Sequence, residues 1–113
     1  MWLLVLIQVA TPALPSAQEY PPDLERGKTI YLRHCRSCHG ETGEGNGPGA
    51  ESLPLAPANF RHPRSLLKSD EDLLRIIEHG IVFSPMHAWR GRLADEEMQD
   101  VLAYIRFLSQ DSP

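Results

Sequence analysis

The chain contains two cysteines, Cys35 and Cys38, and His39 directly follows the second. Residues three apart lie on one face of a helical turn, so both thiols can reach the same ligand. Two thiols with this spacing can form thioethers with the vinyl groups of one porphyrin edge, which brings the next histidine under the iron. The Cys-Arg-Ser-Cys-His segment therefore predicts one covalently attached haem c, with His39 as the proximal iron ligand.

A Cys-x-x-Cys pair has two other common uses, and the sequence supports each of them less well. A thioredoxin-like dithiol stands beside a βαβ pattern, and no such pattern is visible here. A zinc site needs four ligands. The histidines that could complete one are scattered along the chain at His34, His62, His79 and His87.

Haem iron has a second axial position, and Met86 is the best candidate for it. Met1 starts the chain, and Met98 lies on the apolar stripe of a predicted helix. Met86 lies in the segment Ser-Pro-Met-His-Ala-Trp, where Pro85 disfavours helix and stiffens the approach. His87 is the alternative ligand, because imidazole also binds iron. A methionine that only fills a gap in the core is the other interpretation.

Three helices are predicted to position these residues, over about residues 23–40, 69–80 and 95–108. Asp23 and Ser69 are suitable N-caps, and a glycine ends each of the first two helices. The third helix carries an apolar side chain every three to four residues. These residues are Met98, Val101, Leu102, Ile105 and Leu108. No stretch alternates with a period of two, so we expect an all-α fold.

A long loop separates the first two helices. Residues 43–63 are rich in glycine and proline and include the run Gly-Glu-Gly-Asn-Gly-Pro-Gly. This run is not a phosphate-binding loop, because no Gly-Lys-Ser/Thr follows it. A loop of this length usually has a function.

Size and charge limit the function further. The 113 residues are enough for one domain, which buries only a modest core of its own. A bound cofactor would add to that core. The net charge is −4 and no block of Lys or Arg is present, so nucleic acid is not an expected partner.

The N-terminus predicts export from the cytoplasm. The apolar run at residues 2–10 has the length of a signal-peptide core, and Ser16 and Ala17 are small residues suited to cleavage before Gln18. The segment departs from the usual signal-peptide pattern in two ways: no Lys or Arg precedes the apolar run, and Pro15 stands three residues before the cleavage point, where proline is unfavourable. The alternative is a buried strand or helix. The run is too short to cross a bilayer, which needs about 20 residues, so an uncleaved membrane anchor is the less favoured outcome. We therefore expect a signal peptide at residues 1–17, one domain at 18–113, and a periplasmic or otherwise exported protein.

From about Asp23 to Ser109 the sequence resembles the class I cytochromes c. Gly27 and Tyr31 stand four apart before Cys-Arg-Ser-Cys-His-Gly, and the glycine- and proline-rich loop is similar to that of bacterial haem subunits and soluble cytochromes. The Met86 loop follows a short helix, and the last segment, LADEEMQDVLAYIRFLS, resembles the terminal helix of the family. The resemblance implies a cytochrome c-like fold, with three or more helices wrapped around one haem and long irregular loops.

The resemblance also assigns supporting roles. In the family the first and last helices cross, a glycine on one admits an aromatic residue of the other, and Gly27 and Tyr104 would take these roles. A loop proline carbonyl accepts the second N–H of the proximal histidine; Pro57 matches best, with Pro54 and Pro48 as alternatives.

Trp89 is expected beside the haem or its propionates, or else as part of the core. The sequence departs from the family in two places: His87 stands where proline is common, and Ala94 stands where serine usually caps the last helix.

An iron held by His39 and Met86 has no free site for oxygen or substrate. We therefore expect a one-electron carrier rather than an enzyme, with transient redox-protein partners. Two alternatives remain: a haem subunit of a larger oxidase or dehydrogenase complex, and a haem sensor or peroxidase with an open distal site.

Overall fold

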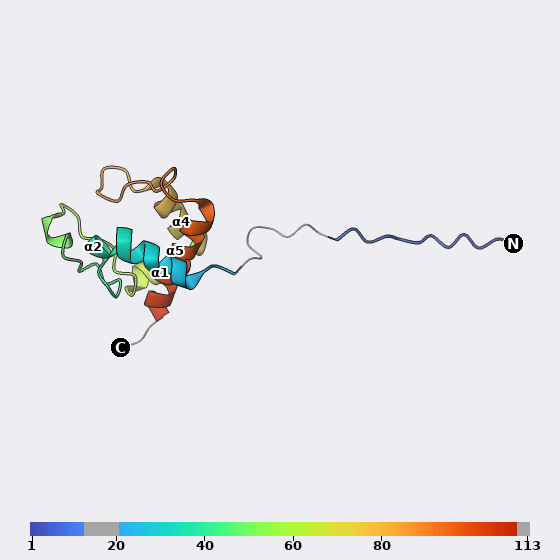
Figure 1. Cartoon of the computed structure of the whole chain (residues 1–113), viewed down its shortest axis with the longest axis horizontal. Helices are drawn as coiled ribbons and strands as arrows, with labels where there is room; N and C mark the ends of the chain where they lie inside the picture. The colour runs from blue at the N-terminus through green and yellow to red at the C-terminus, as the bar shows by residue number, and fades with distance from the viewer. Residues whose placement is uncertain (13–20, 111–113) are drawn as a thin grey trace.

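The structure is a computed structural model that describes residues 1–12 and 21–110 (Figure 1). Its helices are α1 (Leu24–His34), α2 (Arg36–His39), the 3-10 helix η2 (Ala50–Ser52), α3 (Pro63–Leu66), α4 (Asp70–His79) and α5 (Asp95–Gln110). These ranges contain no strand, only an isolated bridge between Arg90 and Leu93. The predicted all-α fold is confirmed.

Residues 1–12 extend away from the helical domain (Figure 1). They have no regular secondary structure and are exposed, including the apolar run at residues 2–10. This run is therefore not a buried strand or helix of the domain. The predicted cleavage position after Ala17 lies outside the described residues. Among those that are described, no helix combines the length and hydropathy needed to cross a membrane.

The predicted helix at residues 23–40 is present but divided. Asp23 caps α1 by accepting a hydrogen bond from the Arg26 N–H at 3.0 Å. The helix ends at His34, with Cys35 as its C-cap at φ −116°, and α2 then forms a separate turn that ends at His39, with Gly40 as its C-cap. The first cysteine therefore stands between two helical segments.

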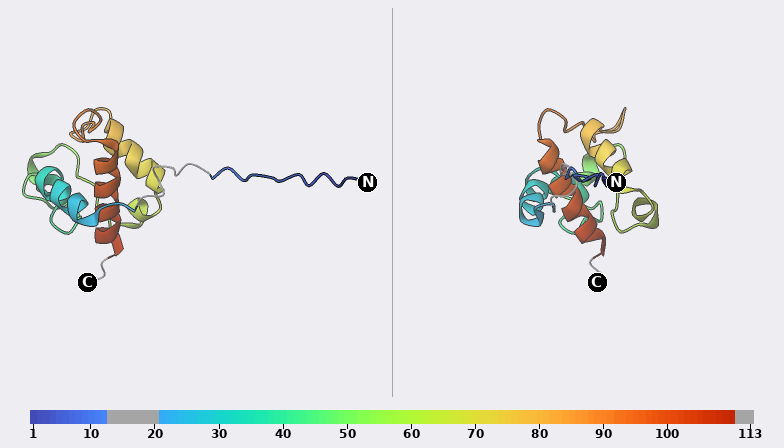
Figure 2. Two further views of the ribbon diagram at one scale, coloured as in Figure 1. Left: turned by 45° about the vertical axis from the view of Figure 1, so that its right-hand side comes forward. Right: turned by 90° about the vertical axis from the view of Figure 1, so that its right-hand side faces the viewer.

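Helix α1 crosses the long helix α5, as Figure 2 shows. The crossing is close because Gly27 has no side chain: a Cβ there would overlap the carbonyl oxygen of Asp100. Asp100 is buried, and it accepts hydrogen bonds from the Asp23 N–H at 2.8 Å and from the Arg26 side chain at 2.5 Å. The backbone of α5 at Asp100 therefore takes the place that the resemblance gave to an aromatic side chain opposite Gly27.

The apolar stripe predicted for the last helix forms most of the core. All five of its residues, Met98, Val101, Leu102, Ile105 and Leu108, are buried. Burial of one such side chain stabilises the fold by roughly 1.5–3 kcal/mol. Tyr104 packs edge-on against Tyr31 of α1 with ring centroids 5.3 Å apart, so the aromatic contact between the two helices is with Tyr31.

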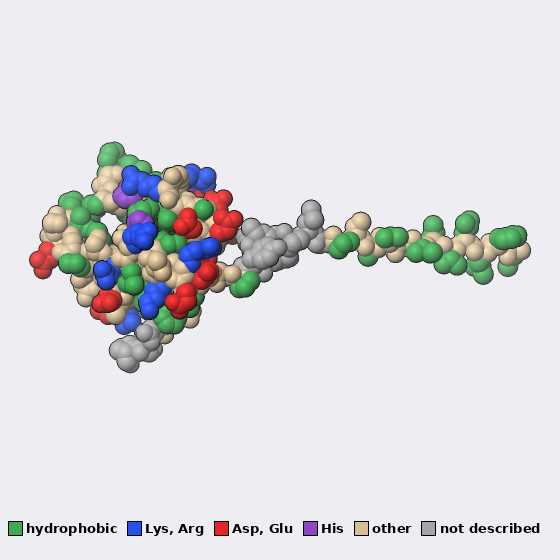
Figure 3. Space-filling model, in the orientation of Figure 1, with side chains coloured by type: hydrophobic (Ala, Val, Ile, Leu, Met, Phe, Trp, Pro, Cys, Tyr) green, Lys and Arg blue, Asp and Glu red, His purple; other side chains and the backbone are tan. Residues whose placement is uncertain are grey.

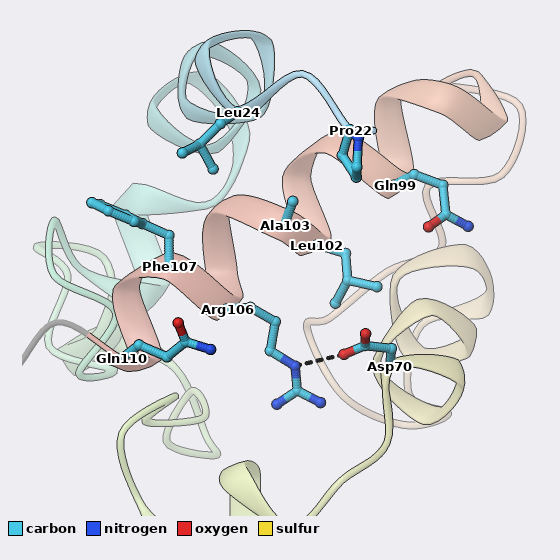
Figure 4. Close-up of a pocket in the computed structure, with 9 residues that line it drawn as sticks. All are labelled: Pro22, Leu24, Asp70, Gln99, Leu102, Ala103, Arg106, Phe107 and Gln110. Atoms are coloured by element: carbon cyan, nitrogen blue, oxygen red, sulfur yellow. Dashed lines mark hydrogen bonds and ion pairs between the residues drawn. The ribbon is translucent and has the colours of Figure 1, made fainter. Parts of the chain in front are cut away.

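Helix α4 begins as predicted, with the Ser69 hydroxyl accepting from the Asp72 N–H at 3.1 Å, and it ends at Gly80. Arg106 joins its start to α5: the guanidinium donates to Asp70 at 2.7 Å and to the Lys68 carbonyl at 2.5 Å. Figure 4 shows this pair inside a groove of about 340 Å³ beside α5. None of the candidate haem-binding residues lines the groove.

Candidate haem-binding site

The two cysteines and His39 form one compact turn: Cys35 stands between α1 and α2, and Cys38 and His39 belong to α2 itself. The Cys38 and His39 N–H groups donate to the Cys35 carbonyl at 3.3 and 2.9 Å, so the segment folds back on its first cysteine. Both cysteines are free and half-buried. Burial, and then the proximity of Cys38, raise the pKa of the Cys35 thiol to about 12. The geometry fits two thiols held ready for covalent attachment to a ligand on one side of the turn.

His39 is oriented by the long loop that follows. Its Nδ1 lies 3.2 Å from the Ala58 carbonyl oxygen, and its ring stacks on Phe60 with centroids 4.7 Å apart. A carbonyl oxygen can only accept, so in the neutral ring this bond places the proton on Nδ1 and leaves a lone pair on Nε2. Burial lowers the pKa of His39, while the bond to Ala58 opposes that shift. The ring is therefore prepared to bind a metal through Nε2.

The acceptor for His39 differs by one residue from the sequence prediction. Pro57 was expected to supply this carbonyl, and the structure places Ala58 there instead. The path of the loop is set by contacts that its own sequence does not reveal: the Phe60 N–H donates to the Gly43 carbonyl at 2.7 Å, and Gly45 lies against the Pro57 carbonyl. Contact between Pro57 itself and a haem stays a prediction.

The glycine run has a clear structural role that the sequence analysis missed. The N–H groups of Gly45, Gly47 and Gly49 donate to the carbonyls of His39, Cys38 and Ser37 at 2.8, 3.0 and 2.7 Å, respectively. Every second residue of the loop thus satisfies one carbonyl at the end of α2, a place where helices leave such groups unpaired.

Glycine is required in this ladder because the loop runs close to the turn. A Cβ at Gly47 would overlap the Ser37 carbonyl oxygen, and Gly45 has φ +79°. The spacing Gly-x-Gly-x-Gly after the cysteine motif was the signal that could have revealed this contact. The ladder fixes the backbone that carries Cys38 and His39.

Met86 lies in a loop that is fastened to the end of α4. The Ile81 N–H donates to the Met86 carbonyl at 2.9 Å, and the Met86 N–H donates to the Ser84 hydroxyl at 3.2 Å. The chain then returns to α4, where the Trp89 N–H donates to the Ile77 carbonyl at 2.9 Å. The Met86 side chain is half-buried, so the loop presents a partly sheltered thioether.

Trp89 lies between two histidines. Its ring centroid is 4.9 Å from that of His34 and 4.5 Å from that of His87. His34 ends α1 immediately before Cys35, so these tilted ring contacts connect the Met86 loop to the attachment turn. Trp89 is half-buried and packs against the core. Contact between Trp89 and a haem stays a prediction.

Zinc has no support in the part of the chain that the structure describes. There, no three side chains of the His, Cys, Asp and Glu types lie close enough together to hold a metal ion. Among the same residues, no hydrogen bond or ring contact joins Met86 to His39, and the connection between their segments runs through Trp89 and His34.

Taken with the all-α fold, this attachment turn defines a c-type cytochrome domain. Residues 22–105 match the family model described as cytochrome C oxidase, cbb3-type, subunit III, and the chain belongs to this family. It is 30% identical to cytochrome c6 of Thermosynechococcus vestitus over 107 residues, which cover 90% of this chain and 80% of that protein. It is also 30% identical to the cbb3-type cytochrome c oxidase subunit FixP of Bradyrhizobium diazoefficiens over 96 residues. That alignment covers 84% of this chain but only 30% of FixP.

Two solved structures also share this fold. A chain of the reducing HAO-like protein complex of Kuenenia stuttgartiensis superposes with a TM-score of 0.69 at 31% identity, over 80% of this chain and 44% of that one. The c-type cytochrome KustC0563 superposes with a TM-score of 0.59 at 26% identity, over 74% of this chain and 98% of its own length. The family and the cytochrome c fold expected from the sequence are confirmed.

Proposed function

We propose that this chain is a one-electron carrier of the cell envelope. Cys35 and Cys38 would hold one haem through thioethers, and His39 and Met86 would bind its iron. When bound, the haem supplies an iron that accepts and returns single electrons. The observation that carries the proposal is the attachment turn, in which both thiols are free and the Ala58 carbonyl leaves Nε2 of His39 available.

The long loop supports the proximal side. The bond from Nδ1 of His39 to the Ala58 carbonyl fixes the ring's tautomer and makes the other nitrogen a stronger donor. Phe60, stacked on the same ring, restricts its rotation and excludes water. The chain's own groups therefore orient the ligand before any partner docks.

Contacts of His87 support Met86 as the distal ligand. The His87 ring packs at a tilt against Trp89, and its Nδ1 lies 3.0 Å from the Ala88 carbonyl oxygen. His87 is exposed, whereas Met86 is half-buried, and this difference favours the thioether as the ligand. A neutral thioether favours ferrous iron and raises the reduction potential relative to stronger donors.

Carbon monoxide binding tests the closed coordination. Protein made with haem-attachment machinery should resist carbon monoxide when reduced and should show a weak near-infrared sulfur-to-iron band when oxidised. Met86→Ala should lose the band, bind carbon monoxide and have a lower potential. His87→Ala is the matched control and should keep the band. The opposite pattern would make His87 the ligand, and carbon monoxide binding by the unmodified protein would favour a sensor or peroxidase.

A second candidate function is supported by the family itself. The chain spans 30% of the length of FixP and 28% of the related subunit CcoP of Azospirillum brasilense, both named as subunits of a cbb3-type oxidase. A permanent haem subunit of a larger complex would carry the same attachment turn. Purification from native membranes in mild detergent separates the two functions, because a subunit stays with its complex and a free carrier does not.

A further inference from the structure

Two segments of the chain contain no carboxylate although the chain as a whole is acidic. Residues 32–40 carry Arg33 and Arg36, residues 80–94 carry Arg90 and Arg92, and neither stretch contains Asp or Glu. All 15 acidic residues lie elsewhere and give a net charge of −4. The two segments are those that hold the attachment turn and Met86.

These segments belong to one side of the molecule. The ring contact between His34 and Trp89, at 4.9 Å, joins the end of α1 to the Met86 loop. All four arginines are exposed. Among the ion pairs of the described residues, only one involves any of the four: Arg90 lies 3.6 Å from the Glu78 carboxylate. In Figure 3, basic and histidine side chains lie side by side in the upper part of the domain, and acidic side chains lie mainly toward the side from which the N-terminal segment leaves, with others at the opposite and lower edges. We call Arg33, Arg36, Arg90 and Arg92 the basic face.

An apolar tip projects from the same loop. Ile81, Val82 and Phe83 are exposed, and Phe83 is 99% exposed. Phe83 also has φ +61°, a left-handed conformation that is unfavourable for a residue with a Cβ. An aromatic ring held in water on a strained backbone is unfavourable in the isolated chain, and it gains apolar burial when a second surface covers it.

We propose that the basic face and the apolar tip form the docking surface for an acidic redox protein. The inference rests on the proposed function, since it places electron exchange beside the attachment turn. Charge complementarity selects the partner: four exposed arginines, of which only Arg90 is paired with a carboxylate, attract an acidic surface, and Phe83 fits an apolar socket within it. The local positive charge steers the approach in spite of the negative net charge.

Small redox ions test the sign of the local charge. Each hexacyanoferrate(III) ion takes one electron from the reduced protein, and its reaction depends on the charge near the point of transfer. We expect the oxidation rate to fall roughly 3-fold or more as ionic strength rises from about 10 to 200 mM, because salt screens an attraction. The cationic oxidant tris(phenanthroline)cobalt(III) should react faster with added salt. The net charge of −4 alone predicts the opposite result, in which salt speeds the reaction with hexacyanoferrate(III) and slows the reaction with the cobalt complex. That result would overturn the inference.

Charge-reversal variants locate the effect. The double variant Arg33→Glu/Arg92→Glu should reverse both salt slopes, whereas Arg64→Glu, with an exposed side chain outside the two segments, should keep their signs. Equal effects of both changes would mean that only net charge matters and would contradict the proposal. A protein without attached haem reacts with neither oxidant, and that result counts against the proposed function instead.

Voltammetry tests the tip with gold electrodes coated by carboxylate-ended chains, alone or mixed with methyl-ended chains. The protein should exchange electrons with both layers at low salt. Phe83→Gly relieves the strained backbone and removes the ring, and it should weaken binding to the mixed layer at least 3-fold while leaving the pure carboxylate layer unaffected. Unchanged binding to the mixed layer would remove the tip from the docking surface.

Vesicle binding tests a membrane as the alternative occupant. Co-sedimentation of the protein with phosphatidylglycerol vesicles at physiological salt would assign the surface to a membrane and overturn the proposal of a protein partner.

Discussion

Trp89 packs against His34 with ring centroids 4.9 Å apart, and this contact joins the loop that carries Met86 to the helix that precedes Cys35. The two residues are 55 positions apart in the chain. In the proposed function, this contact therefore connects the loop that holds the distal ligand Met86 to the turn that holds the haem.

Replacement of Trp89 by alanine should loosen the Met86 loop. The change removes the ring contacts with His34 and His87 and part of the core packing, so we expect the free energy of unfolding to fall by about 2 kcal/mol. Chemical denaturation measures this loss. The near-infrared band assigned to Met86 should weaken as well, and Trp89→Phe should restore most of it. A band of full strength in Trp89→Ala would show that these ring contacts do not position Met86.

Gly47→Ala should disrupt the attachment turn. The new methyl group would overlap the Ser37 carbonyl oxygen, and neither backbone segment can move without breaking the glycine ladder. We expect a loss of about 2 kcal/mol or more in the free energy of unfolding and a lower yield of haem attachment.

Gly91→Ala is the matched control for this change. Its Cβ would meet no atom within 4 Å, although its φ of +86° disfavours alanine. It should cost about 1 kcal/mol and leave haem attachment unaffected. Equal attachment in the two variants would mean that the ladder does not shape the turn.

Tyr31 gives the fold a defined response to alkaline pH. Its buried hydroxyl donates to the Gly40 carbonyl at 2.6 Å, and burial raises its pKa above the ordinary value of 10.0. The unfolded chain therefore loses this proton at a lower pH than the folded chain, so stability falls as pH rises above about 10.

Tyr31→Phe removes this part of the pH dependence. The variant should lose about 1 kcal/mol at neutral pH, because the Gly40 carbonyl loses its donor. Its stability should fall less steeply between about pH 10 and 11, as denaturant titrations at several pH values would measure. Burial also raises the pKa of Tyr104, so the variant should keep a smaller dependence of stability on pH. Parallel curves for the two proteins would rule out Tyr31 as the source.

The haem should be required for the fold. Replacement of both cysteines by alanine should leave a chain with low helical circular dichroism and rapid proteolysis, because a ligand that binds only the native state stabilises it. A haem-free double variant with the helicity of the parent protein would contradict this expectation.

The helices with strong local signals could be predicted from the sequence. Ser69 and Asp72 mark the start of α4, and the spacing from Met98 to Leu108 marks the buried side of α5, because caps and apolar periodicity act over a few residues. The weak cap expected at Ala94 is offset by Glu97, whose side chain accepts from the Ala94 N–H at 2.9 Å. The three-residue spacing that identifies such a capping box was visible in the sequence.

Features set by distant contacts could not be predicted in the same way. The division of the first helix at Cys35 and the choice of Ala58 over Pro57 both depend on how the glycine-rich loop returns to the turn. Helix α3 was also missed, although Pro63 at its first position, with His62 as N-cap, is a known start signal. The attachment motif was readable because its chemistry is local, whereas the position of Met86 relative to His39 depends on the whole fold.

The most direct test of the central claim is the mass of the protein after denaturation in acid and organic solvent. Thioethers survive these conditions, and haem that is only coordinated does not, so the mass should exceed that of the polypeptide by one haem. The same spectrum should show the chain beginning at Gln18, as expected for an exported protein. A bare polypeptide mass after expression with haem-attachment machinery would contradict covalent attachment at Cys35 and Cys38 and, with it, the proposed electron carrier.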